Sequence, residues 1–156
     1  MKARSPLEWL VHPWASLAVR WILGAVMLGA ALPKIADPPG FAQSIHAYGL
    51  LPLGAVKPVA LLLPWLEGFC GLALVAGPGR RGGAAWTLLL MALFTGALGL
   101  NLWRGHPVDC GCFGAAQGAR PLEARLLDMK LAILRDLGLA VLSVQVLWSA
   151  RRRPSP

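Results

Sequence analysis

The sequence predicts an all-α integral membrane protein, a bundle of four transmembrane helices with a periplasmic Cys-X-Cys loop and a short interfacial helix before the fourth span. Hydrophobic residues make up 56% of the 156 residues and charged residues only 14%, whereas soluble domains contain roughly 25% charged residues. The sequence also contains four apolar segments whose lengths are close to the roughly 20 residues that a helix needs to cross a bilayer. We therefore expect residues 1–156 to form a single membrane domain.

The predicted spans are residues 14–32, 58–76, 82–103 and 131–150. The third span contains no charged residue and is the clearest of the four. Arg20 interrupts the first apolar segment and a polar stretch precedes it, so we expect a retained helix and not a cleavable signal peptide.

The fourth span has to include Arg135 and Asp136, because the apolar stretch after them is too short to cross a bilayer. Before this span, residues 121–135 carry leucines at helical spacing with charged residues on the other face. Pro121 and Glu123 suit a helix start. This segment is therefore predicted to form a helix that lies in the membrane interface.

The net charge of +8 does not indicate a nucleic-acid-binding protein. Many of the basic residues lie in short clusters beside apolar segments, not along one amphipathic stretch. This placement indicates membrane topology. The expected environment is the lipid bilayer, and no nucleic-acid partner is expected.

Lysines and arginines near the span ends are equally numerous on the two sides of the membrane, so their number alone does not fix the orientation. On one side they form tight clusters that include Arg80 and Arg81, and on the other they are spread over the longer loops 33–57 and 104–130. The second of these loops contains two cysteines, and disulfide chemistry is typical of compartments outside the cytoplasm. We expect a bacterial inner-membrane protein with both termini cytoplasmic and the cysteine loop periplasmic.

Cys110 and Cys112, separated by one glycine, are the predicted catalytic residues. A disulfide between them would close a small, strained ring, and strained disulfides are the labile, oxidising ones. Nearby Arg104 and His106 favour the thiolate form, whereas Asp109 opposes it. A static disulfide and metal capture by the two thiols remain alternatives. Because Cys70 lies about 18 Å along the second span from its outer end, we expect it to act only as a small hydrophobic residue.

Arg20 and Glu67 are charged residues inside the first and second spans, where ionisable groups are costly and usually paired or functional. We expect an ion pair between them that links the two helices, with proton handling as the alternative. Lys34 and Asp37, at the end of the first span, are expected to pair with each other and to support the site.

Several segments together resemble the MauE branch of the DoxX-like membrane proteins. They are RWILGAVMLGAALPKIADPPGF (20–41), YGLLP (48–52), LPWLE (63–67), NLWRG (101–105) and DCGCFG (109–114). The resemblance implies a four-helix, redox-associated membrane protein linked to maturation of the methylamine dehydrogenase light chain, a periplasmic subunit rich in disulfides. It also implies that the site elements are Arg20, Lys34, Asp37, Glu67, Cys110 and Cys112. Its DoxX-like relatives imply membrane quinone as a candidate electron acceptor.

The predicted function is therefore thiol-disulfide exchange with an exported periplasmic protein, with no resident metal. A thiolate of the partner attacks one sulfur of the pair, and the resulting mixed disulfide is then resolved. Two other classes stay open. One is a transport or binding protein for a soft metal such as copper or mercury, held by the two thiolates. The other is a non-catalytic assembly subunit whose cysteines only lock the loop.

Overall fold

The described part of the chain, a computed structural model of residues 13–106, 108 and 121–152, consists of helices and their connections. Its helices are α2 (Pro13–Ala36), α3 (Pro38–Ala47), α4 (Leu53–Ala76), α5 (Arg80–Trp103) and α6 (Leu122–Arg152). All but α3 are long and apolar enough to cross a membrane. The predicted all-α class with four membrane-crossing helices is confirmed.

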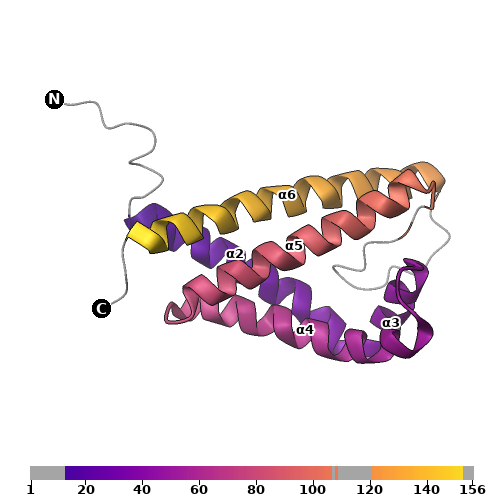
Figure 1. The fold of residues 1–156 in the computed structure, drawn as a ribbon, viewed down its shortest axis with the longest axis horizontal. Helices are drawn as coiled ribbons and strands as arrows, with labels where there is room; N and C mark the ends of the chain where they lie inside the picture. Colours follow the sequence, from indigo (N-terminus) through magenta and orange to yellow (C-terminus); the bar gives the residue numbers. More distant parts are fainter. Residues whose placement is uncertain (1–12, 107, 109–120, 153–156) are drawn as a thin grey trace.

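The four long helices run side by side and alternate in direction (Figure 1). The start of α2, the turn between α4 and α5 and the end of α6 lie at one end of the bundle, and α3 lies at the other. Contacts are most extensive between α5 and α6 and between α2 and α4. Arg80, Arg81 and Arg151 thus lie toward the end of the molecule opposite to α3.

The core runs through all four long helices. Its main cluster consists of Leu23, Met27, Cys70, Leu74, Ala84, Leu90, Met91, Leu139 and Val146. A smaller cluster at the α3 end contains Leu98, Val108, Met129 and Ala132. Many large apolar side chains on the outside of the long helices are exposed, among them Leu62, Phe69, Leu93, Leu134 and Val141. This distribution suits a bundle whose sides face lipid.

Glycines bring helices α2 and α4 into close contact. A Cβ atom added to Gly24 would lie 2.5 Å from Val75 Cγ2 and 2.9 Å from the carbonyl oxygen of Gly71. A Cβ atom on Gly71 would in turn lie 3.0 Å from the carbonyl oxygen of Gly24. Small residues are typical of membrane helix contacts because they let two backbones approach each other. The pair Gly24 and Gly71 therefore fixes the register of α2 against α4.

Helix α3 forms within what the sequence predicts to be a loop. The side chain of Asp37 caps it, since Asp37 Oδ1 accepts a hydrogen bond from Gly40 N at 3.0 Å. Pro38 occupies the first helical position, where the missing N–H costs nothing. The connection to α4 then turns through Gly49, whose φ of 62° favours glycine. Asp37 thus stabilises the start of a helix and is not the partner of Lys34 that we expect from the sequence.

Helix α6 is continuous from Leu122 to Arg152, so the predicted interfacial helix and the fourth span form one element. Two adjacent charged residues in its middle, Arg135 and Asp136, bond to each other. Arg135 donates to Asp136 Oδ1 from Nε at 3.0 Å and from Nη2 at 2.7 Å. Because each charge offsets the other, the helix continues through them without a break.

Candidate functional site

A buried ion pair joins the first two spans. Lys34 Nζ of α2 lies 2.7 Å from each carboxylate oxygen of Glu67 of α4. Lys34 is 3% exposed and Glu67 is 1% exposed. Ionisable groups this deep in a membrane bundle are expensive to bury, and pairing offsets part of that cost.

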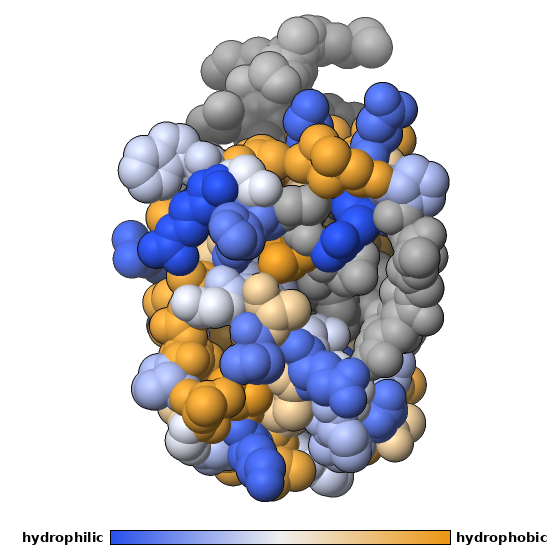
Figure 2. All heavy atoms as spheres, turned by 90° about the vertical axis from the view of Figure 1, so that its right-hand side faces the viewer, coloured by the Kyte–Doolittle hydropathy of each residue, from blue (hydrophilic) through white to orange (hydrophobic). Residues whose placement is uncertain are grey.

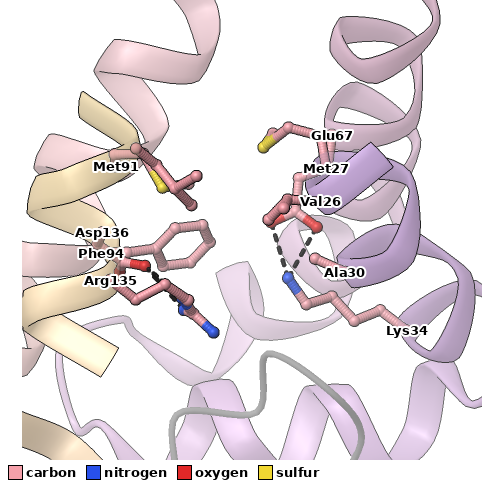
Figure 3. Close-up of a pocket in the computed structure, with 10 residues that line it drawn as sticks. Val26, Met27, Ala30, Lys34, Glu67, Met91, Phe94, Arg135 and Asp136 are labelled. Carbon is pink, nitrogen blue, oxygen red and sulfur yellow. Dashed lines mark hydrogen bonds and ion pairs between the residues drawn. The ribbon is translucent and has the colours of Figure 1, made fainter. Parts of the chain in front are cut away.

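The direction of helical side chains explains why these two residues meet. In an α-helix each Cα–Cβ bond tilts toward the N-terminus. Since α2 and α4 are antiparallel, the long side chain of Lys34 leans toward the middle of the bundle and Glu67 leans toward Lys34 (Figure 3). Arg20, in contrast, leans toward the start of α2 and away from Glu67.

The predicted ion pair between Arg20 and Glu67 is therefore wrong. Arg20 instead donates from Nε to the carbonyl oxygen of Leu74 at 3.0 Å and from Nη2 to that of Val75 at 3.4 Å. These carbonyls belong to the last turn of α4, where an arginine is a favourable cap for the exposed backbone acceptors. The function of Arg20 in the fold is to tie the start of α2 to the end of α4.

Two aromatic rings border the ammonium group of Lys34. Its Nζ lies 5.1 Å from the ring centroid of Phe41 of α3 and 5.3 Å from that of Phe94 of α5. Rings within about 6 Å attract a cation through their electron-rich faces. Three helices, α3, α4 and α5, thus each contribute a contact to this one lysine of α2.

A second charge pair faces the first across a small cavity. Asp136 of α6 is 1% exposed, and it accepts two hydrogen bonds from its neighbour Arg135. Figure 3 shows this pair on one side of the cavity and the pair of Lys34 and Glu67 on the other. The cavity is lined by Val26, Met27, Ala30, Lys34, Glu67, Met91, Phe94, Arg135, Asp136 and Leu139. The arrangement places two cations and two carboxyl groups inside the bundle.

A second, apolar pocket also borders Phe94. It has a volume of about 360 Å³ and is formed by α3, α4 and α5. Its polar side chains are those of Ser44 and Tyr48, and the remaining lining is apolar: Phe41, Ile45, Leu50, Leu51, Val59, Leu63, Leu90, Leu93, Phe94 and Ala97. Phe41 and Phe94 therefore border both the ammonium group of Lys34 and a pocket suited to an apolar ligand.

The remaining predicted site residues lie at the α3 end of the bundle or outside the described residues. Arg104 and His106 are exposed just after α5, and the backbone N–H of His106 donates to the carbonyl oxygen of Asn101 at 3.0 Å. Asp109, Cys110 and Cys112 lie outside the described residues. Figure 2 views this end of the molecule, where hydrophilic side chains are spread over the face.

Cys70 is buried in the main core cluster between apolar residues, as the sequence predicts. The sequence alone does not assign Phe94, Arg135 and Asp136 to a site, although all three line the small cavity between the two ion pairs. For the two charged residues a signal was present, because ionisable groups inside an apolar span are usually functional or paired. Phe94 carries no such signal, since an aromatic residue in a membrane helix is most often a packing residue.

The fold and these two ion pairs define a multi-pass membrane protein with a polar site enclosed by its helices. Residues 12–149 match the family described as "Methylamine utilisation protein MauE". The chain therefore belongs to the MauE family.

Curated relatives agree with this assignment. The chain is 37% identical over 137 residues to the methylamine utilization protein MauE of Methylophilus methylotrophus, an alignment that covers 87% of this chain and 67% of the relative. It is 31% identical over 135 residues to MauE of Paracoccus denitrificans, covering 86% of this chain and 72% of the relative. MauE of Methylorubrum extorquens is 31% identical over 140 residues, covering 89% of this chain and 72% of the relative. No solved structure matches the chain.

Proposed function

We propose that this protein is a thiol-disulfide exchange protein of the bacterial inner membrane that takes part in methylamine utilisation. Its substrate is a periplasmic protein such as the methylamine dehydrogenase light chain, which it oxidises or to which it relays oxidation. Two observations together carry the proposal. The chain belongs to the MauE family, and the connection between two spans contains two thiols, Cys110 and Cys112, separated by one residue.

The proposed orientation places the α3 end in the periplasm and both termini in the cytoplasm. Arg80, Arg81 and Arg151 belong to the opposite end of the bundle, and clusters of basic residues are typical of the cytoplasmic side. The connection with the cysteines starts after Trp103 and returns at Leu122, and both of these residues belong to the α3 end. In this orientation the thiols face a compartment where disulfides persist.

The exchange moves one pair of electrons. A thiolate of the reduced partner attacks one sulfur of the disulfide between Cys110 and Cys112, and the other sulfur leaves as a thiolate. The second thiol of the partner then attacks the mixed disulfide, so the partner becomes a disulfide and the pair becomes a dithiol. Two electrons and two protons have then to leave the pair before the next cycle.

Membrane quinone fits the apolar pocket between α3, α4 and α5 as the acceptor. The pocket volume of about 360 Å³ and its lining suit an apolar ring and the start of an isoprenoid tail. Ser44 and Tyr48 are the polar side chains of this lining, and Ser44 Oγ donates its proton to the carbonyl oxygen of Gly40 at 3.2 Å. When bound, a quinone supplies a two-electron, two-proton acceptor.

Thiol trapping in membranes tests the exchange. In Cys112→Ala the remaining Cys110 can attack a disulfide of an oxidised partner, the reverse of the exchange, and it has no resolving thiol. We therefore expect a mixed disulfide with a periplasmic protein to accumulate and to disappear on reduction. Cys110→Ala tests the other thiol. Cys70→Ala is the matched control, because Cys70 is buried in the core and should change neither result. Absence of any trapped partner, together with stoichiometric copper or mercury bound by the reduced pair, would support a metal-binding protein instead.

A further inference from the structure

One oxygen of a deeply buried carboxyl group has no partner. Arg135 donates both of its hydrogen bonds within the pair to Oδ1 of Asp136. Among the described residues nothing bonds to Oδ2, although Asp136 is 1% exposed. Buried polar atoms are nearly always satisfied by protein or by ordered water, because an unsatisfied one is costly. A bound water molecule would satisfy Asp136 Oδ2, as donor when the oxygen is ionised and as acceptor when it carries a proton.

The cavity beside Asp136 has the size for one water molecule, and polar side chains border it although its exposed lining is mostly apolar. Its volume is about 20 Å³, and a buried water needs roughly 10–15 Å³ and two to four polar partners. Besides Asp136, the polar residues that line it are Arg135, Lys34 and Glu67. The two carboxyl groups come from α6 and α4 and border the same space (Figure 3).

We propose that one water molecule occupies this cavity and that Asp136, the water and Glu67 form a proton-exchange site inside the bundle. With both carboxyl groups ionised, their charges balance those of Lys34 and Arg135. The site then takes up one proton. The proton binds to either carboxyl group. It passes between them when the water accepts a proton from one carboxyl group and donates one of its own protons to the other carboxylate.

Among the described residues that line the cavity, only these groups can exchange a proton. Helix α2 contributes Lys34, and α6 contributes Arg135 and Asp136. Helix α4 contributes Glu67, and Cys70 lies one turn further along it. Helix α5 lines the cavity only with Met91 and Phe94, which do not titrate. The exchange breaks and forms only O–H bonds, so it needs no oxidant or reductant and does not depend on Cys110 and Cys112.

Infrared difference spectra of the full chain in lipid nanodiscs, recorded as pH is lowered, test this site. The expected signal is one carbonyl stretching band of a protonated carboxyl group that shifts in D₂O. Asp136→Asn and Glu67→Gln should each alter this same band, because the two groups share the proton. Glu123→Gln is the matched control at an exposed position of α6 and should leave the band unchanged.

Three results would overturn the proposal: no carboxyl band, a band altered by only one of the two variants, or two separate bands that each disappear in one variant. If Asp136→Asn or Glu67→Gln does not fold, Asp136→Glu or Glu67→Asp keeps the acid and should shift the band. A structure that resolves water must also show one within hydrogen-bond distance of Asp136 Oδ2, and an empty cavity would contradict the site. A variant without Cys110 and Cys112 should keep the band, which separates this result from that of the thiol chemistry.

Discussion

Lys34 Nζ lies 2.7 Å from both carboxylate oxygens of Glu67, so an ion pair connects α2 to α4 inside the bundle. The rings of Phe41 and Phe94 border the same ammonium group. Breaking a buried pair leaves one uncompensated charge, which costs more than the pair contributes when intact. The stability of the bundle should therefore depend on the two residues together.

Removing either charge alone should destabilise the protein strongly. We expect Lys34→Met and Glu67→Gln each to reduce the free energy of unfolding by about 3–5 kcal/mol. The double variant Lys34→Met/Glu67→Met should lose much less than the sum, because no charge is left unpaired. Thermal unfolding in detergent measures all three. Single variants that are as stable as wild type would contradict the burial of the pair.

A double-mutant cycle distinguishes the two possible partners of Glu67. Arg20→Gln should cost about 1.5–3 kcal/mol because it removes charged hydrogen bonds to the end of α4. Its effect should add to that of Glu67→Gln within about 0.5 kcal/mol, since the two side chains share no partner. Lys34→Met and Glu67→Gln should instead be strongly coupled. Strong coupling between Arg20 and Glu67 would contradict this assignment and support the ion pair predicted from the sequence.

The sequence predicts four membrane-crossing helices but not the pairing of their charges. Length and apolar composition are sufficient for a membrane-crossing helix, so α2, α4 and α5 begin and end within a few residues of the predicted spans. The partner of Glu67 depends on the register between two helices and on the direction of each side chain. The close contact of Gly24 with Gly71 sets that register, and it is visible only in the structure.

Two local features were partly visible in the sequence. An aspartate followed by proline, as at Asp37 and Pro38, is typical of a helix start. From the sequence we nevertheless predict a loop for the short segment that forms α3. The sequence shows that the fourth span has to include Arg135 and Asp136, but not that the two side chains bond to each other. Their mutual hydrogen bonds remove the reason for a break, so the helix continues.

The contact between α2 and α4 should not tolerate a side chain at Gly24. Gly24→Val would place atoms within 2.5–2.9 Å of Val75 and the backbone of Gly71, and such overpacking costs about 1–3 kcal/mol. Gly29→Val is the matched control on the same helix, since a Cβ there meets nothing within 4 Å. Thermal unfolding should show a loss for the first variant only. Equal stability of the two variants would contradict the close approach of the backbones.

The cap of α3 should depend on the side-chain oxygen of Asp37. Asp37→Ala removes the acceptor for Gly40 N and should cost about 1 kcal/mol. Asp37→Asn keeps an acceptor and should retain most of the stability. Hydrogen exchange of the α3 amides measures the effect locally, and faster exchange is expected only in the alanine variant. If both variants exchange at the wild-type rate, the cap does not stabilise α3.

The oxidation state of the periplasmic substrate tests the proposed thiol exchange most directly. In a methylamine-using host that lacks its own MauE, the disulfides of the methylamine dehydrogenase light chain would be counted by mass spectrometry after thiol alkylation. We expect wild type and Cys70→Ala to restore a fully oxidised light chain, whereas a variant with Cys110→Ala and Cys112→Ala leaves free thiols although it inserts into the membrane normally. Full oxidation of the light chain by that double variant would contradict the proposal.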